Sequence, residues 1–278
     1  YSTDDTTLTK LLDAHPVIAK IQLYRERHKL HSTYIEPLLT LANNAPDNRI
    51  HTSFIQTGTA TGRLSSKNPN LQNIPTRSEL GKEIRGGFIA KEGYTLLGLD
   101  YSQIELRLLA HYSSDATLLD AFSNAKDIHR ETAVKLFGEA EADEKRGVAK
   151  SVNFGLLYGM GSKKLADTVG ISTKEAKSII ESYFEHFSSV KSYFEEIKLG
   201  AKKEGFVTTL LGRRRYFDFE KANGMQYAMF ERESINTLFQ GSAADLIKLS
   251  MNKIHEIYKN REDIKMLLQI HDELIFEV

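Results

Sequence analysis

Residues 96–107 read LLGLDYSQIELR, and this stretch decides how the rest of the chain is organised. An apolar run ends at Asp100, and a helical pattern begins two residues later at Ser102. A strand that passes into a helix in this way brings a carboxylate to the C-terminal edge of a sheet. One carboxylate means little by itself, so its role depends on a second carboxylate and a phosphate-binding surface elsewhere in the chain.

Glu105, in the first turn of that predicted helix, has two interpretations. Residues 102–105, Ser-Gln-Ile-Glu, fit a capping box, in which the Glu105 side chain accepts the backbone N–H of Ser102. Alternatively, Glu105 points towards the sugar of a bound substrate. The local pattern leaves both interpretations open.

Composition limits the class of protein. The chain has 278 residues, 41% of them hydrophobic, which is enough to bury the core of one or two domains. The absence of Cys excludes disulfides and thiolate metal sites. No apolar run has the length of a membrane span and no signal-peptide pattern is present, so we expect a cytoplasmic protein without a membrane partner. The 37 basic and 37 acidic residues balance, and net charge therefore argues neither for nor against nucleic acid.

Periodicity and turn residues divide the rest of the chain into helical and extended parts. Pro37 is expected to break the second helix of an N-terminal pair. In order, we expect a helix pair over 1–45, a strand over 49–56, a polar turn-rich segment to 75, helices over 115–225, a long amphipathic helix over about 224–259, and strands over 264–270 and 274–278.

A second source of carboxylates lies between the last two strands, in His271-Asp272-Glu273. Gly or Asn would make an easier turn, and adjacent like charges call for a divalent cation. If the strands that end at Asp100 and Asp272 share a sheet, the two carboxylates meet. Two Mg²⁺ ions roughly 3.5–4 Å apart could then activate a hydroxyl and stabilise a leaving pyrophosphate. The alternative is that Asp272 and Glu273 are only exposed turn residues.

A candidate phosphate grip lies in residues 145–159, KRGVAKSVNFGLLYG. Arg146, Lys150, Phe154 and Tyr158 recur every four residues and therefore lie along one side of a helix. Cations followed by aromatic rings suit a triphosphate and its nucleoside. A surface helix with a core-facing Phe/Tyr pair is the alternative.

Two further segments have the residue types that contact a duplex. Arg232, Asn236 and Gln240 form a second stripe at four-residue spacing, and such donors can bind minor-groove acceptors without reading sequence. The turn-rich segment that contains Arg63 combines small polar residues, Asn and Arg, which suit phosphates and groove edges. The alternatives are a helix face bonded to neighbouring protein and a solvated loop.

These stretches together resemble the motifs of the family A DNA polymerases of bacteria. Residues 100–107 (DYSQIELR) resemble motif A, residues 146–159 (R-x3-K-x3-FG-x2-YG) motif B on the fingers O helix, and residues 269–273 (QIHDE) motif C. The resemblance covers nearly the whole chain, and three motifs in the family's order make it specific. Residues 61–66 (TGRLSS), 70–77 (NLQNIPTR) and 232–241 (RESINTLFQG) also match.

The resemblance implies a metal site. Asp100 and Asp272 would bridge two Mg²⁺ ions, for which Mn²⁺ can substitute, and the Tyr101 carbonyl would be a backbone ligand. Glu273 would be an accessory catalytic carboxylate. Lys150 would protonate the leaving pyrophosphate.

The resemblance also implies the contacts to both substrates. The incoming deoxynucleoside triphosphate would be bound by Arg146, Lys150, Phe154, Tyr158, His129, Glu105 and Gln103. Glu105 would be the steric gate against a 2′-hydroxyl, and Phe154, where other members have Tyr, implies discrimination against dideoxynucleotides. Primer–template DNA would be contacted by Arg63, Asn70, Asn73, Arg77, Arg232, Asn236, Gln240 and His271.

The fold implied is α+β: a right-hand polymerase with an antiparallel palm sheet, an inserted helical fingers domain and a partial helical thumb. Expected boundaries are thumb base 1–48, palm 49–113, fingers 114–224 and palm 225–278. Because the sequence begins at Tyr1 without Met, lacks most of the thumb, and stops after motif C, we expect a segment of a longer protein. The resemblance implies a monomeric, nucleoid-associated enzyme of DNA replication and repair.

Two rival functions use the same observations. A single-subunit RNA polymerase or reverse transcriptase has a two-metal palm too, although Glu105 and the residues 271–273 argue against it. A non-catalytic DNA-binding module is the other rival, and the intact carboxylates at positions 100 and 272 argue against that.

Overall fold

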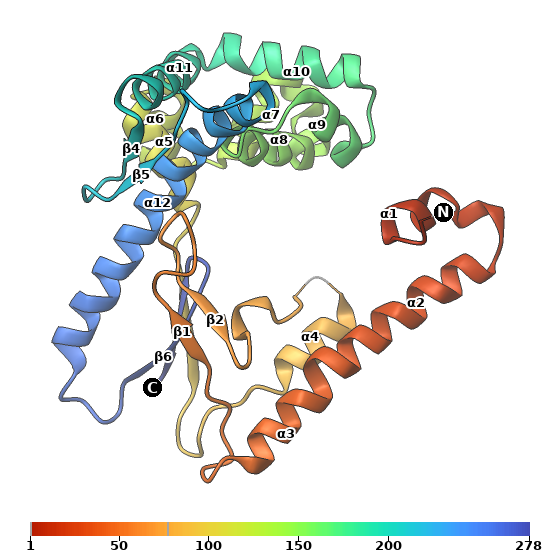
Figure 1. Ribbon diagram of the computed structural model, residues 1–278, viewed down its shortest axis with the longest axis vertical. Coiled ribbons are helices and arrows are strands. Elements are labelled where there is room, and N and C mark those ends of the chain that lie inside the picture. The colour runs from red at the N-terminus through yellow and green to blue at the C-terminus, as the bar shows by residue number, and fades with distance from the viewer. Residues whose placement is uncertain (1, 77) are drawn as a thin grey trace.

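The structure is a computed structural model that describes residues 2–76 and 78–278. In this part of the chain, helices surround small antiparallel sheets, as expected for an α+β fold (Figure 1). Helices from α5 (Ile104–Ser113) to α11 (Ser188–Glu204) cluster at the top of Figure 1, and a central sheet lies below them. Arg77, a predicted DNA contact, lies outside the described residues.

The central sheet consists of β3 (Leu96–Asp100), β7 (Glu273–Glu277) and β6 (Lys265–Ile270) in that order, with both pairs antiparallel. Asp100 is paired with Glu273, and the Tyr101 N–H donates to the Asp272 carbonyl over 3.0 Å. Strands that are 170 residues apart in sequence therefore join at their ends, which confirms the shared sheet.

The N-terminal part is an extended run of helices on one side of the molecule (Figure 1). Pro37 does not break it, contrary to expectation: Pro37 lies at the start of α3, directly after the π-helical turn η2, and the backbone before it stays helical. The elements here are α1 (Asp5–Lys10), η1 (Leu12–Ala14), α2 (Val17–Leu30), the π-helical η2 (His31–Ile35) and α3 (Glu36–Asn44).

The segment between α3 and the central sheet has little regular structure. Of the strand predicted over 49–56, only the last part pairs, with Ile55 opposite Ser65. Its elements are β1 (Ser53–Ile55), β2 (Ser65–Lys67), η3 (Leu71–Asn73) and α4 (Glu79–Gly86). The loop between β1 and β2 rises towards the upper helices in Figure 1.

Several of the upper helices begin at residues whose side chains accept backbone N–H groups. Asp127 caps α7, and Ser172 with Glu175 forms a complete capping box on α10. The elements are α6 (Ala116–Ser123), α7 (Ile128–Phe137), η4 (Glu139–Glu141), α8 (Ala142–Leu157), α9 (Ser162–Val169), α10 (Thr173–His186), β4 (Phe206–Thr208), β5 (Arg214–Tyr216) and α12 (Gly224–Tyr258).

The main hydrophobic core lies where α5, α10, α11 and α12 meet. Tyr183, Phe187 and Phe239 are fully buried there, and Leu106 and Leu109 of α5 pack into the same cluster. Burying each such side chain contributes about 1.5–3 kcal/mol. The core therefore holds α5, which follows Asp100, against α12. No helix within the described ranges is long and apolar enough to cross a membrane.

Candidate active site

The two predicted carboxylates meet at one end of the central sheet. Asp100 is the last residue of β3, and Asp272 lies in the turn between β6 and β7. Burial raises the pKa of the Asp272 carboxyl, Arg63 lowers it, and the nearby charge of Asp100 raises it again. The negative charges of Asp100 and Asp272 therefore act on each other, as in a site built for a cation.

The residues present fit a hard divalent cation with few protein ligands. Asp272 Oδ1 is buried and, among the described residues, accepts no hydrogen bond. No group of three or more His, Cys, Asp or Glu side chains in residues 2–76 and 78–278 is arranged to hold a metal. Two carboxylates and the Tyr101 carbonyl would leave positions for water and phosphate oxygens, as Mg²⁺ prefers.

Glu273 lies opposite Asp100 in the β3–β7 pair. Arg85 Nη2 lies 3.3 Å from its Oε2, and its Oε1 is packed so closely against Gly98 that a Cβ there would overlap it. These residues also line a groove of about 1990 Å³ that extends from the sheet to α3. The accessory role of Glu273 stays a prediction.

Arg63 connects Glu105 with Asp272. The Arg63 guanidinium donates to Glu105 Oε1, and Nη2 lies 3.6 Å from Asp272 Oδ1. Burial raises the pKa of the Glu105 carboxyl, whereas Arg63 and the Tyr158 phenol lower it. The pKa of Tyr158 is in turn raised by burial and by Glu105. The side chain of Glu105 is only 3% exposed, so Arg63 is the main compensation for a buried charge.

The capping-box interpretation of Glu105 is wrong. The helix begins at Ile104 rather than Ser102, and Gln103 before it is left-handed, with φ of 54° and no side-chain cap. That backbone turns Glu105 towards Arg63, and an ion pair in a buried site outweighs a local cap of about 1 kcal/mol. Gln103, a predicted nucleotide contact, forms the left-handed turn that precedes α5.

The predicted phosphate grip lies along α8. Lys150 is exposed, and Arg146 Nε donates to Asp127 Oδ2 over 2.5 Å. Tyr158 lies just past the last helical residue, beside Glu105 rather than on the helix. The structure therefore brings the aromatic end of the stripe to the carboxylates and leaves the cationic end open to solvent.

Two glycines, one in the last turn of α8 and one just after it, pack closely against other parts of the protein. A Cβ on Gly159, whose φ is +69°, would lie 2.6 Å from Arg232 Cγ on α12. Gly155 similarly packs against Met160. The close approach to the backbone at both glycines is internal packing, which at Gly159 joins the end of α8 to α12.

His129, predicted to contact phosphate, is buried at 2% exposure beside Phe154. Thr132 Oγ1 donates to the Ile128 carbonyl over 2.7 Å, so it accepts the Asn153 amide, which also donates to His129 Nδ1 over 3.1 Å. The proton of a neutral His129 is thereby placed on Nε2. Sequence analysis missed Asn153, whose position between Lys150 and Phe154 was the available signal.

The neutral state of His129 predicts a pH dependence of stability. Burial lowers its pKa from 6.5 to about 4 in the fold, so the unfolded chain binds more protons between these values. The contribution of His129 to the free energy of unfolding is fully present above pH 6.5 and is lost as the pH falls towards 4. Thermal unfolding across this range should show a smaller loss in His129→Gln than in the wild type; equal losses would contradict the assignment.

The predicted DNA contacts lie on several elements. Arg232 is exposed on α12, whereas Asn236 and Gln240 are partly buried on the same face. His271 is exposed at the hairpin tip with φ of 53°. Asn70 caps η3, and the carbonyl of Asn73 accepts the Tyr34 hydroxyl over 2.9 Å. The last two therefore shape their loop, whatever else they contact.

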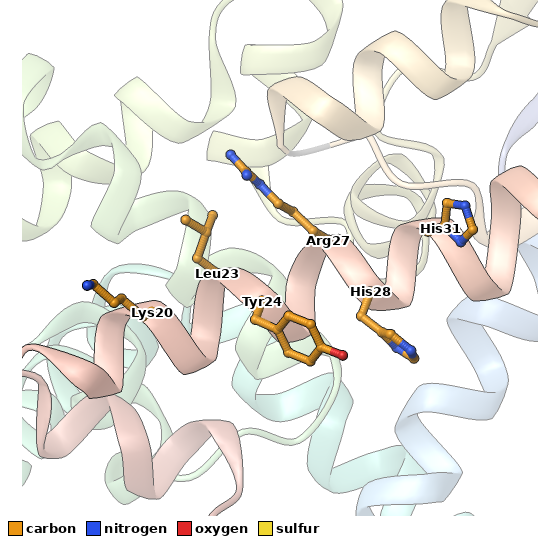
Figure 2. A pocket seen from close by; sticks show the side chains of 6 residues that line it. All are labelled: Lys20, Leu23, Tyr24, Arg27, His28 and His31. Atoms are coloured by element: carbon orange, nitrogen blue, oxygen red, sulfur yellow. The ribbon is translucent and has the colours of Figure 1, made fainter.

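Sequence analysis also missed a face of α2. Figure 2 shows Lys20, Leu23, Tyr24, Arg27, His28 and His31 lining a shallow pocket along one side of this helix. Spacings of three and four residues were the signal for it. The face lies on α2 and the start of η2, which extend away from the sheet in Figure 1, and its Arg27 and His31 also line the groove that reaches Asp100 and Asp272.

The family described as DNA polymerase family A matches residues 1–278. DNA polymerase I of Helicobacter pylori strain 26695 is 57% identical over 279 residues, covering 100% of this chain and 31% of that protein. Thermostable DNA polymerase I of Thermus aquaticus is 48% identical over 282 residues, covering 99% and 33%.

A solved structure is similar throughout. The POL domain of Pol1 from M. smegmatis, in complex with DNA primer-template and dNTP, superimposes with a TM-score of 0.93 at 42% identity. The match covers 100% of this chain and 50% of that one. The chain thus spans about a third of the curated relatives named above. The chain belongs to DNA polymerase family A.

Proposed function

We propose that the protein containing this chain is a DNA-directed DNA polymerase, which adds deoxynucleotides to a primer 3′-hydroxyl. The observation that carries the proposal is the meeting of Asp100 and Asp272 at one end of the sheet, with a buried, unsatisfied Asp272 oxygen. The similar proteins named DNA polymerase I, and the Pol1 structure with primer-template and dNTP, support it.

Asp100, Asp272 and the Tyr101 carbonyl would hold two Mg²⁺ ions, or Mn²⁺ in their place. The ions would supply Lewis-acid activation of the primer hydroxyl and charge stabilisation for the leaving pyrophosphate. The protein's part is to orient oxygen ligands on two adjoining strands. Glu273, fixed by Arg85, would add negative charge nearby.

The nucleotide would lie along α8. Lys150 would bind the triphosphate and protonate the leaving pyrophosphate. Arg146 would release its hydrogen bond to Asp127 and bind a phosphate instead. Nε2–H of His129, free of competing protonation near neutral pH, would donate to the same group. Phe154 would pack on the sugar and Tyr158 at the insertion site.

Glu105 would be the gate that excludes a 2′-hydroxyl, because its buried carboxylate is held rigidly by Arg63 beside Tyr158. Glu105→Ala should raise the ratio of ribonucleotide to deoxynucleotide incorporation by about ten-fold or more. Single-nucleotide extension with both substrates measures this ratio. An unchanged ratio, with only a lower melting temperature, would mean that Glu105 is structural.

The duplex would be contacted in its minor groove by Arg63, Asn236 and Gln240, with further contacts from Asn70, Asn73, Arg77, Arg232 and His271. Such contacts follow duplex shape rather than sequence. Gln103 would adjoin the nucleotide. The thumb, palm and fingers boundaries given above are part of the proposal, as are a monomeric state, a cytoplasmic, nucleoid-associated location and roles in replication and repair.

Primer extension by the full-length protein tests the proposal. We expect extension with deoxynucleotides on a DNA template, and little with ribonucleotides. Preference for ribonucleotides would favour the RNA polymerase alternative, preference for an RNA template would favour the reverse transcriptase, and duplex binding without any extension would favour the non-catalytic module.

A further inference from the structure

The guanidinium of Arg213 lies where three segments of the chain meet. It follows the turn of the β4–β5 hairpin, and its Nε donates to Asp245 Oδ1 of α12 over 3.1 Å. Nη2 donates to the carbonyl of Gly241, also on α12, over 3.0 Å. The third segment is the loop between β1 and β2, at Gly62. One side chain therefore touches elements far apart in sequence.

The contact with both glycines is too close for any other residue. A Cβ on Gly62 would lie 2.5 Å from Arg213 Cζ, and one on Gly241 would lie 2.6 Å from Thr209 Cγ2 and 2.9 Å from Arg213 Nη2. Gly62 also has φ of +79°, which favours glycine. Because two hydrogen bonds anchor the guanidinium, it cannot move aside without losing them, and its plane sets the spacing of the two backbones.

Asp245, the anchor, is itself fixed. It is 7% exposed and accepts the Thr209 hydroxyl on its other oxygen, while Thr209 Oγ1 accepts the Arg213 N–H over 3.1 Å. The Leu210 N–H donates to Ser242 Oγ over 3.0 Å. The hairpin turn is thus clipped to α12 through a buried, hydrogen-bonded network, which makes the position of Arg213 rigid.

Each glycine adjoins a residue that the proposed function places in the minor groove. Arg63 follows Gly62 and reaches Glu105 and Asp272, and Gln240 precedes Gly241. We propose that Arg213 is a positioning residue: it sets the distance between Arg63 and Gln240 and so determines how strictly the primer terminus is read. The inference rests on the proposed function, and the role argued for Arg213 acts through Arg63 and Gln240.

The test compares matched with mismatched primer termini in the full-length protein. Arg213→Lys keeps the charge but loses the planar fork that reaches both partners. We expect kcat from a matched terminus to fall about ten-fold, because small misplacements of binding groups are costly, and selectivity against a mismatched terminus to fall by a similar factor. The KM for the nucleotide, held by α8, should change little.

The adjacent Arg214 offers a matched control. It is exposed on β5 with its guanidinium 4.4 Å from the Phe206 ring centroid, and Arg214→Ala should behave as the wild type in this assay. Gly62→Ala attacks the same contact from the opposite side and should reproduce the loss of selectivity. Thermal unfolding of each variant shows whether it is folded at the assay temperature, and Asp245→Asn provides a milder variant if Arg213→Lys is not.

Wild-type selectivity in folded Arg213→Lys, Asp245→Asn and Gly62→Ala proteins would overturn the inference, even if all three melt earlier. Affinity for matched and mismatched duplexes, measured by fluorescence anisotropy, gives a readout without turnover. If the wild type extends no primer, the proposed function fails, while the ratio of these affinities still tests Arg213: an unchanged ratio in the variants would contradict its positioning role.

Discussion

Replacing Asp272 with Asn should abolish primer extension while leaving duplex binding intact. The substitution keeps the size of the side chain but removes the charge of a residue whose Oδ1 is buried without a hydrogen-bond partner among the described residues. Losing one metal-binding carboxylate removes several kcal/mol of transition-state stabilisation, or about 10³-fold or more in rate. Asp100→Asn or Ala, and Asp272→Ala, should have the same effect, since both residues occupy the joined strand ends.

Rapid-quench extension measures the rate, and fluorescence anisotropy with labelled duplex measures binding. Asp263→Asn is a suitable control, because Asp263 is an exposed partner of Arg261 on the surface. Near-normal extension by either Asp272→Asn or Asp100→Asn would refute the metal assignment. Loss of duplex binding in step with activity would instead point to a folding defect.

Replacing Arg63 with Ala should destabilise the fold as well as impair extension. The substitution leaves the buried carboxylate of Glu105 unpaired, which costs about 3–5 kcal/mol. Burial already raises the pKa of Glu105, and loss of Arg63 raises it further. The folded state then holds a proton that the unfolded chain releases, so the destabilisation should grow as pH rises and shrink as pH falls.

Denaturant unfolding at several pH values tests this prediction. Arg63→Ala/Glu105→Gln should recover most of the lost stability without recovering extension, because the amide needs no counter-charge. Arg130→Ala, at exposed ion pairs with Glu139 and Asp143, should cost far less stability than Arg63→Ala. A loss from Arg63→Ala no larger than this control would show that the Glu105 charge is compensated elsewhere.

The parts of the fold that follow from local sequence were predicted well. Apolar residues recur regularly in the strand that ends at Asp100, in the hairpin around Asp272 and in the long helix α12. The structure contains all three elements. The meeting of the strand and the hairpin in one sheet was predicted because Asp100 and Asp272 each follow an apolar strand. The stripe on α8 was predicted by its spacing, since Arg146, Lys150 and Phe154 all lie within one helix.

Local sequence could not predict the contacts between residues from distant segments of the chain. Ser102 and Glu105 satisfy the pattern of a capping box, but Glu105 pairs with Arg63, 42 residues earlier, and the helix begins elsewhere. Asn153 binds His129 across two helices, and Arg213 binds Asp245 on α12. Such pairings depend on tertiary packing, which overrides weak local preferences.

The central claim, that Asp100 and Asp272 form a divalent-cation site, is tested most directly by Mn²⁺ binding followed by electron paramagnetic resonance. The account predicts that the full-length wild type binds Mn²⁺ in the presence of primer-template and nucleotide, and that Asp100→Asn and Asp272→Asn each lose this binding while still binding duplex. Wild-type Mn²⁺ affinity in both variants would contradict it.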